Sequence, residues 1–533
     1  VYLCGSLCVV YEFRGIPMMA PDILTVQTAT SVMGNYTFKL TFEQYSVILV
    51  CMAFFFTFLR LHEVKVTEKR VFHIAGFIVV ALGCGLFTNQ IILSDFMEEH
   101  QINIRMFRPM ESYQKYGGVL TFARSVGYAV VKKPEGYTTA KVDQIIQEYE
   151  KKSANAQQST AKQYPNIITV VNETFADIKV LGNFKTNEDY MPYFHSLKKN
   201  CVTGYTYASI VGGQTANTEF ELLTGNTLGF LSAGTTAFQL YIHGQMPSLV
   251  SNLKAEGYSG NKAMHPFNPY NYNRPAVYKD FGFTDFIDKF DFPKNVKRVR
   301  EYISDEANVD CIISEYEKNR KKTDQPFYMY NMTIQNHSPY DKDAANFKQP
   351  IKIESSKYDA EANRYLNLIK YSDDSLKQLT SYFEKCKEPT IILFLGDHQP
   401  RLTDEFMNKI TNGQYQTWSS EQMMKRYQVP FVIWANYDIK EQHIEKTSMN
   451  YIQSILTKTA GVKMTGYQRF LNEVRKEVPT ITSQGYWGKN GKFYQINDKG
   501  SPYYGIIQKY RMIQYNMMFD KKNRRDSFFE VSK

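Results

Sequence analysis

The chain has 533 residues, more than one hydrophobic core usually organises, so more than one region is expected and a large enzyme core is possible. Its 63 Lys and Arg against 53 Asp and Glu give a formal charge of +10, which suits anionic lipid headgroups; no basic run is interleaved with aromatics as in a nucleic-acid motif, so nucleic acid is not expected as a partner. The seven cysteines are an odd, sparse set without a CxxC pair, which excludes a disulfide framework and argues against a thiolate zinc site.

Three apolar segments predict a transmembrane region over residues 1–93. Residues 1–12 begin without a charged flank and resemble the end of a span that has been cut, so we interpret the sequence as truncated at its N-terminus. Residues 43–60 and 71–93 follow as further spans, and the second is long enough for a hydrocarbon layer of about 30 Å. The alternative is a pair of buried core helices.

The charges between the spans predict the orientation of the chain. Residues 60–70 carry four cations, whereas the preceding loop, residues 15–44, has only Lys39. Because positive loops stay on the cytoplasmic side, residues 60–70 are expected in the cytoplasm. Everything after residue 93 is then extracytoplasmic, in a multi-pass protein of the cell membrane.

Beyond the membrane, composition divides the chain into three parts. Residues 94–164 are expected to be a helical linker that ends in the low-complexity stretch KKSANAQQSTAKQYP. Residues 165–482 form the expected catalytic domain, and residues 483–533 a C-terminal extension without a catalytic motif. This extension would pack beside the domain, lie near anionic lipid through its basic residues, or remain a solvated tail.

Four short apolar runs predict buried strands of an α/β sheet sandwiched by helices. They cover residues 166–171, 327–334, 390–395 and 429–434, and helical stretches separate them. Three of the runs end in polar residues that can bind metal: Asn172 and Glu173; Gln335, Asn336 and His337; Asp397 and His398. Because open α/β sheets gather their sites at the carboxyl ends of strands, these groups can converge. Each alone could instead be a helix cap or turn residue.

A glycine-containing loop supplies a candidate nucleophile. In YASIVGGQTANTEFELLTG, Gly212 and Gly213 precede Thr215, and a helix is expected to follow. A hydroxyl at a helix start, beside exposed N–H groups, is placed to meet an anionic phosphate. The alternative is that the threonines only cap the helix, and Thr218 with Glu221 fits a capping box.

The combination favours metal-assisted catalysis. A threonine hydroxyl is a poor nucleophile at neutral pH, and coordination to a divalent metal can activate it. Glu173, Asp397 and His398 would supply oxygen and imidazole ligands, a set that suits manganese, magnesium or zinc.

From about Ile23 to the C-terminus the sequence resembles the lipoteichoic acid synthase family, a sulfatase-like branch of the alkaline phosphatase superfamily. The matching pieces are APDILTVQTATSVMGNYTFKLT, NIITVVNETFADI, GGQTANTEFELLTG, TIQNHSPY and LFLGDHQP. The resemblance implies that Glu173, Thr215, Asp397 and His398 bind one metal, usually Mn²⁺, with Mg²⁺ or Zn²⁺ as alternatives. It also implies that Thr215 is the catalytic nucleophile.

The resemblance further implies a substrate pocket made of His265, Tyr272, Arg274 and His337. The guanidinium of Arg274 offers a bidentate fork for phosphate. Two departures fall in this pocket: Tyr272 replaces a tryptophan of the characterised polymerases, and Gln214 replaces a lysine before the nucleophile. They leave open whether the protein builds a polymer or transfers single phosphoglycerol units.

The implied activity is a phosphoglycerol transferase that moves glycerol phosphate from phosphatidylglycerol to a lipoteichoic acid or another cell-envelope glycolipid or glycan through a phospho-threonine-type intermediate. Phosphoethanolamine transfer and sulfatase or phosphatase hydrolysis are alternatives within the superfamily, although the loop lacks the Cys/Ser-x-Pro-x-Arg signature of sulfatases. From a different class, the chain could be an inactive relative that binds anionic lipid or glycan.

Overall fold

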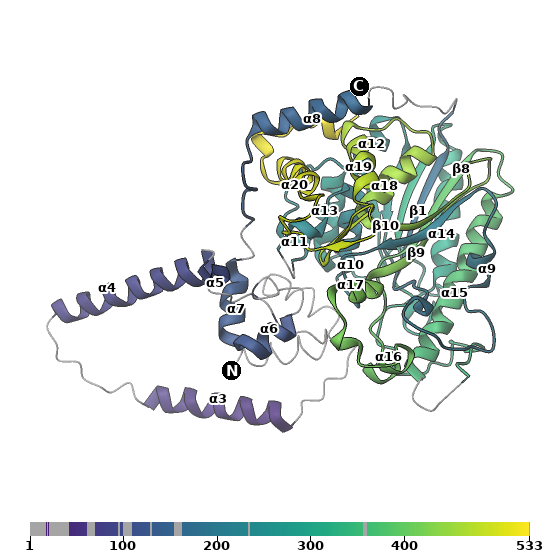
Figure 1. Ribbon diagram of the computed structural model, residues 1–533. Helices are drawn as coiled ribbons and strands as arrows, with labels where there is room; N and C mark the ends of the chain where they lie inside the picture. Colours follow the sequence, from purple (N-terminus) through teal and green to yellow (C-terminus); the bar gives the residue numbers. More distant parts are fainter. Residues whose placement is uncertain are drawn as a thin grey trace. The chain divides into compact units, whose positions relative to one another are not determined.

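The computed structural model describes residues 18, 20, 42–60, 70–93, 96–99, 109–127, 131–153, 163–232, 235–354 and 360–531 (Figure 1). The chain forms two compact units. The smaller comprises Val1–Lys132 with Ser232–Thr235, and the larger comprises Lys133–Leu231 with Thr236–Lys533.

The smaller unit consists of helices in the part that is described. They are α3 (Phe42–Arg60), α4 (Arg70–Phe87) with a π-helical continuation η3 (Thr88–Leu93), α5 (Phe96–Glu99), α6 (Pro109–Tyr116) and α7 (Gly118–Gly127). Large apolar side chains of α3 and α4 are exposed, as Phe54 and Phe77 show. Within the described ranges, one helical segment, Ile74–Ile92, is long and apolar enough to cross a membrane. The predicted span at 1–12 lies outside the described residues, and a multi-pass arrangement stays a prediction.

The larger unit is built on one eight-stranded sheet. Its strands are β1 (Asn166–Asn172), β2 (Cys201–Tyr207), β3 (Ser259–Met264), β4 (Asp285–Ile287), β7 (Phe327–Met332), β8 (Thr390–Gly396), β9 (Gln428–Ala435) and β10 (Gln442–Ser448). Their order is β10-β2-β9-β8-β1-β7-β3-β4, and β9 alone among them runs antiparallel to its neighbours. The four predicted strands are confirmed as β1, β7, β8 and β9.

Side chains alternate between two cores, one on each face of the sheet. In β1, Ile167 and Val171 belong to one core, and Ile168 and Val170 to the other. This period of two explains why strands buried on both faces read as continuous apolar runs in the sequence.

Helices cover both faces of the sheet, as Figure 1 shows. The first core is closed by α8 (Thr139–Ser153), α10 (Thr215–Thr224), α11 (Ala237–Leu240), α12 (Leu249–Ala255), α13 (Arg274–Phe281), α18 (Met449–Thr459), α19 (Gly466–Glu477), α20 (Tyr504–Phe519) and α21 (Asp526–Phe529). The second core is closed by α9 (Pro192–Ser196), α14 (Asp305–Arg320), α15 (Ala360–Phe383) and α16 (Asp404–Ile410). A short helix, α17 (Ser420–Met423), and small sheets β5–β6 (Arg298–Val299, Tyr302–Ile303) and β11–β13 (Thr480–Thr482, Gly485–Trp487, Phe493–Tyr494) complete the unit.

The expected linker is divided between the two units. From Lys133 onward its residues belong to the larger unit, and Val142, Ile145 and Tyr149 on α8 are buried in the first core. The reason is the apolar stripe of α8, which needs a partner surface.

The C-terminal extension packs into the same core as α8. Phe528 and Phe529 are buried there, and the Arg525 guanidinium forms an ion pair with Asp143, Nε to Oδ1, at 2.6 Å. The alternative of a solvated basic tail is therefore wrong for this segment.

Candidate metal centre

Three polar side chains that follow strands β1 and β8 meet at the carboxyl end of the sheet. Glu173 follows β1, and Asp397 and His398 follow β8, which pairs in parallel with β1 along its whole length. The backbone locks these strand ends together, since the Thr174 N–H donates to Asp397 Oδ1 at 2.7 Å and the Asp397 N–H donates to the Asn172 carbonyl at 3.3 Å. Parallel pairing therefore brings residues more than 220 positions apart in the sequence into one cluster.

The ligand atoms of this cluster lie within 4.8 Å of one another. His398 Nε2 lies 3.2 Å from Asp397 Oδ2 and 3.8 Å from Glu173 Oε1. The Thr215 hydroxyl donates to Glu173 Oε2 at 3.4 Å. All four side chains are buried, so the four residues expected as ligands converge on one small volume.

The electrostatics of this volume favour a cation. Burial and the neighbouring Asp397 carboxylate raise the pKa of Glu173 well above its ordinary value, and burial also raises the pKa of Asp397. Asp397 Oδ2 and His398 Nε2 are buried without a hydrogen-bond partner among the described residues. A divalent ion would satisfy both atoms and offset the repulsion between the two carboxylates, so the residues fit a metal with oxygen and imidazole ligands.

The Thr215 hydroxyl stands at the start of α10. Three residues with positive φ precede it: Gly212 (68°), Gly213 (146°) and Gln214 (64°). At Gly212 an added Cβ would lie 3.1 Å from the Cβ of Arg401, so this position needs glycine for both conformation and space. The turn that results places Thr215 as the first helical residue, at the N-terminal end of α10.

The capping box expected for Thr218 and Glu221 does not form. The Thr218 hydroxyl donates instead to the Asp397 carbonyl at 2.8 Å. Glu221 Oε1 accepts hydrogen bonds from the Ser209 hydroxyl and the Leu228 N–H, at 2.7 and 2.8 Å. The reason is that α10 begins at Thr215, with Gln214 as its N-cap, so Thr218 is the fourth residue of the helix and does not stand at its start.

The two candidate substrate histidines are fixed by backbone carbonyls. His265 is buried, its Nδ1 lies 2.9 Å from the Met332 carbonyl oxygen, and burial followed by the charge of Arg274 lowers its pKa well below the ordinary value. Burial lowers the pKa of His337 to about 4. The Arg300 guanidinium donates to the His337 carbonyl at 2.7 Å and so holds the turn that carries this ring.

Arg274, expected as a free fork for phosphate, is partly engaged within the protein. Its Nε and Nη2 donate to Glu219 Oε1 at 3.1 and 2.7 Å, and both side chains are buried. One edge of the guanidinium is therefore occupied, and the Nη1 side is left for a ligand. The Tyr272 ring centroid lies 5.1 Å from the guanidinium carbon of Arg274, so these two predicted pocket residues do lie together.

Two further residues support the site: the sequence named Asn336 only among the polar residues that follow the run 327–334, and it did not single out Glu219. Glu219 holds Arg274, as described, and Asn336 Nδ2 donates to the Glu173 carbonyl and to Asn172 Oδ1, each at 3.0 Å. Asn336 lies in the polar stretch that follows β7, which was a usable signal. Nothing local marks Glu219, because its partner lies 55 residues further along the chain.

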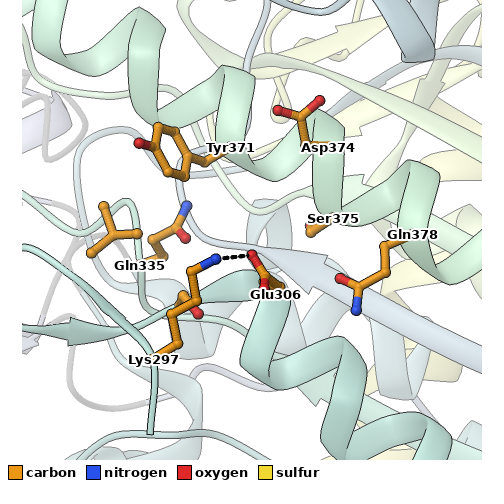
Figure 2. A pocket seen from close by; sticks show the side chains of 9 residues that line it. Lys297, Glu306, Gln335, Tyr371, Asp374, Ser375 and Gln378 are labelled. Carbon is orange, nitrogen blue, oxygen red and sulfur yellow. Dashed lines mark hydrogen bonds and ion pairs between the residues drawn. The ribbon is translucent and has the colours of Figure 1, made fainter. Parts of the chain in front are cut away.

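A cavity of about 340 Å³ lies beside the N-terminal end of α14 (Figure 2). Polar side chains dominate its lining, among them Gln335, Asp374 and the Lys297–Glu306 ion pair. None of the metal-ligand candidates contributes to it. Its link to the centre is Gln335, whose Nε2 donates to Asn336 Oδ1 at 3.0 Å.

Known proteins resemble this chain over most of its length. Residues 165–462 match the model of the Sulfatase family. A Rhizobium meliloti protein, provisionally named a cyclic β-1,2-glucan modification protein, is 31% identical over 433 residues, which are 80% of this chain and 65% of that protein. The lipoteichoic acid synthase of Staphylococcus saprophyticus is 24% identical over 383 residues, 67% of this chain and 55% of that enzyme. The chain thus spans less than two thirds of the length of either relative.

Solved structures share the fold. The Streptococcus pyogenes phosphoglycerol transferase GacH, in complex with sn-glycerol-1-phosphate, superposes with a TM-score of 0.61 at 20% identity and covers 75% of this chain and all of that one. The Listeria monocytogenes lipoteichoic acid synthase LtaP superposes with a TM-score of 0.50 at 19% identity and covers 73% of this chain and 96% of that one.

Proposed function

The chain belongs to the sulfatase family, within the alkaline phosphatase superfamily, and on that basis we propose that it is a membrane-anchored, metal-dependent phosphoglycerol transferase of the lipoteichoic acid synthase type. Its donor is phosphatidylglycerol, and its acceptor is a lipoteichoic acid or another cell-envelope glycan. The observation that carries the proposal is the buried cluster of Glu173, Asp397 and His398 around the hydroxyl of Thr215.

The reaction proceeds in two displacements at phosphorus. Thr215 Oγ1 forms a bond to the phosphorus of phosphatidylglycerol, the bond from phosphorus to the diacylglycerol oxygen breaks, and the threonine proton passes to that oxygen. A glycerophosphoryl-threonine remains. An acceptor hydroxyl then bonds to the phosphorus, the bond from phosphorus to Thr215 Oγ1 breaks, and the acceptor proton passes to that oxygen.

The chain's own residues prepare this step. A divalent ion, manganese by family resemblance, would lower the pKa of the Thr215 hydroxyl and polarise the phosphate. We expect the N–H groups at the start of α10 and the Arg274 guanidinium to receive the phosphoryl oxygens. His337, whose low pKa keeps it neutral at pH 7, can bind the glycerol or shuttle a proton.

Transfer of single units to a glycan is favoured over polymer synthesis. The two departures from the polymerases stand beside candidate site residues, Tyr272 against Arg274 and Gln214 directly before Thr215. The Rhizobium relative, which matches over more of this chain than the synthases quoted, is provisionally named for modification of a cyclic β-1,2-glucan. A glucan or glycolipid hydroxyl is therefore the proposed acceptor.

The catalytic unit works at the outer face of the cell membrane. The helix Ile74–Ile92 anchors the chain. The cations at residues 60–70 keep this segment, which precedes the helix, in the cytoplasm. A lipid donor requires this placement, because the scissile phosphate lies at the level of the headgroups.

The test is diacylglycerol release from fluorescent phosphatidylglycerol by the purified full chain with manganese. We expect Thr215→Ala to lower the rate by about 1000-fold or more, since no other hydroxyl can form the intermediate. Thr417→Ala, a change at an exposed threonine, should leave the rate within about twofold of the wild type.

Three outcomes would contradict the proposal. Release that persists without Thr215 or without metal would rule out the nucleophile. Consumption of phosphatidylethanolamine, or of simple phosphate or sulfate esters, in place of phosphatidylglycerol would favour the alternative enzymes. A wild-type chain that neither retains stoichiometric metal nor consumes any of these substrates would be the inactive binding protein.

A further inference from the structure

A strip of ring and charged side chains leads from His337 to the protein surface. The Phe267 ring stacks on the His337 ring, with centroids 6.4 Å apart and planes at 20°. Lys289 Nζ lies 5.8 Å from the Phe267 centroid and 5.0 Å from the Phe290 centroid. We call Phe267, Lys289 and Phe290 the aromatic strip. Its inner end touches a residue of the candidate site, and its outer end, Phe290, is 73% exposed.

Two neighbouring loops hold the strip in place. Phe267 follows strand β3, whereas Lys289 and Phe290 follow β4, which pairs with β3 in parallel. The loops remain bonded beyond the strands, because the His265 N–H donates to the Ile287 carbonyl at 2.9 Å and the Lys289 N–H donates to the Phe267 carbonyl at 3.4 Å. The carboxyl end of the sheet, where the candidate metal ligands meet, therefore also positions the aromatic strip.

The exposure of these rings is unusual for this unit. Within the described part of the larger unit, the large apolar side chains that are exposed are Phe290 and Tyr270, at 73% and 71%. Both stand in the two loops just described, and Tyr270 follows Phe267 by three residues. Exposed rings gathered beside a polar site, and absent from the rest of the described surface of the unit, mark a binding surface.

Charges around Phe290 select the kind of ligand. The Phe290 N–H donates to Asp288 Oδ1 at 2.7 Å, and the Asp288 N–H donates to Asp291 Oδ2 at 2.8 Å, so two carboxylates belong to the turn that carries the ring, and Lys289 Nζ lies 5.0 Å from the ring centroid. An anionic bilayer surface would be repelled by both carboxylates. A sugar ring offers C–H groups to an aromatic face and hydroxyls that need both donors and acceptors, which Lys289 and the two carboxylates supply.

We propose that the aromatic strip binds a neutral sugar ring of the acceptor glycan and leads its hydroxyl toward the phosphorylated Thr215. This inference rests on the proposed transferase function and adds the acceptor site to it. In the transfer step the sugar oxygen bonds to phosphorus, the bond from phosphorus to Thr215 Oγ1 breaks, and the sugar proton passes to that oxygen.

The test compares Phe290→Ala with Phe290→Tyr in the full chain, purified in detergent with manganese. The probes are neutral glucose oligosaccharides with β-1,2 and other linkages, and binding is measured by titration calorimetry. Because a ring contact is worth about 1 kcal/mol, we expect Phe290→Ala to weaken binding about fivefold, and Phe290→Tyr, which keeps the ring, to bind within about twofold of the wild type.

Several results would overturn the inference. They are equal oligosaccharide binding by Phe290→Ala and the wild type, no binding of any neutral oligosaccharide by the wild type, or a loss that Phe290→Tyr shares. A fourth contradicting result is that Phe290→Ala no longer floats with vesicles of phosphatidylcholine and phosphatidylglycerol but still binds the oligosaccharides. That result would make the aromatic strip a membrane contact. The binding readout needs no donor, so it stays informative even if the wild type releases no diacylglycerol, a result that would count against the transferase itself.

Discussion

The Glu219 carboxylate links the helix of the proposed nucleophile, Thr215, to the candidate phosphate ligand Arg274. Thr215 and Glu219 are four residues apart on α10 and so share one face of the helix. Glu219 Oε1 accepts two hydrogen bonds from Arg274, and Oε2 accepts the hydroxyls of Tyr278 and Tyr330. A buried ion pair with both carboxylate oxygens occupied has little freedom to move. Glu219 therefore sets where the Arg274 guanidinium stands relative to the Thr215 hydroxyl.

Replacing Glu219 by Gln keeps the shape of the side chain and removes the charge that positions Arg274. We expect diacylglycerol release to fall by about tenfold or more, equivalent to roughly 1.4 kcal/mol of transition-state stabilisation. In an Arg274→Ala background the same change should cost less than about twofold, because its effect passes through Arg274. Tyr330→Phe, which removes one hydroxyl from Oε2 and leaves the contact with Arg274, is the matched control.

The rates of these four proteins must be measured below their unfolding temperatures, since breaking a buried ion pair also costs stability, about 3–5 kcal/mol. Losses that simply add in the double variant would show that Glu219 acts on the fold and not through Arg274. A Tyr330→Phe loss as large as that of Glu219→Gln would point the same way.

At the scale of single residues, the sequence is informative where a side chain that can bind metal directly follows a strand. Glu173, Asp397 and His398 come within two residues of the ends of β1 and β8, and parallel pairing then forces them together. Glu219 gave no such signal, because its surroundings read as an ordinary helix and its ion-pair partner comes from α13. The sequence around Thr218 was misleading, because it fits a capping motif although the Thr218 hydroxyl donates to the Asp397 carbonyl.

Helix α10 is an element without a solvent-facing side, and this affects its second glutamate. All ten of its residues, Thr215–Thr224, are buried. Burial raises the pKa of Glu221 to about 7, against the stabilising hydrogen bonds that its Oε1 accepts. The helix that carries the proposed nucleophile therefore contains a carboxyl group that stays protonated in the folded protein to about neutral pH.

The pKa of Glu221 predicts how stability changes with pH. Below pH 4.5, its ordinary value, the group is protonated in both the folded and the unfolded chain, so it contributes no pH dependence. Between pH 4.5 and about 7 the unfolded chain binds fewer protons than the folded one, and the free energy of unfolding falls as pH rises. Above pH 7 the loss is complete, and for a shift of this size it amounts to about 3 kcal/mol.

Glu221→Gln should abolish this loss, because an amide oxygen accepts the same hydrogen bonds and carries no charge. We expect thermal unfolding of the full chain at pH 5 to change little on substitution and the variant to be clearly more stable than the wild type at pH 8. Glu188→Gln, at an exposed glutamate, should show no such difference between the two pH values. A variant that is less stable than the wild type at both pH values would contradict a protonated Glu221.

Among elements, the sequence revealed the centre of the sheet and not its edges. β1, β7, β8 and β9 are mostly apolar and almost wholly buried, because cores lie on both of their faces. The missed strand β10 (QHIEKTS) is an edge strand with three buried residues, and it lacks the continuous apolar pattern that identifies a strand. Strand β3 (SGNKAM) is likewise polar, and its pairing with β7 shifts register between Gly260 and Lys262.

At the scale of the whole molecule, the two ends of the larger unit pack against each other. Helix α8 near its start contacts α19 and α20 near its end, and Lys509 Nζ forms an ion pair with Glu148 Oε2 at 2.6 Å. The Tyr137 hydroxyl donates to Asp520 Oδ2 at 2.8 Å, a contact between residues 383 positions apart. Low complexity after α8 made this region look like a linker, although the helix itself belongs to the fold.

The folded unit should therefore begin near Lys133 and not at residue 165, where the family match starts. A fragment of residues 133–531 is expected to unfold cooperatively. A fragment of residues 165–531 would expose the core surface that Val142, Ile145 and Tyr149 cover. Burial of these three side chains contributes about 5–9 kcal/mol to the free energy of unfolding, which is comparable to the whole stability of a typical domain. Ile145→Asp in the longer fragment is the matched point variant, and its unfolding temperature should drop by roughly 10 °C, because an unpaired charge would be buried. Equal unfolding temperatures for the two fragments, measured by scanning calorimetry, would show that α8 is a linker after all, since its apolar stripe would then add nothing to the core.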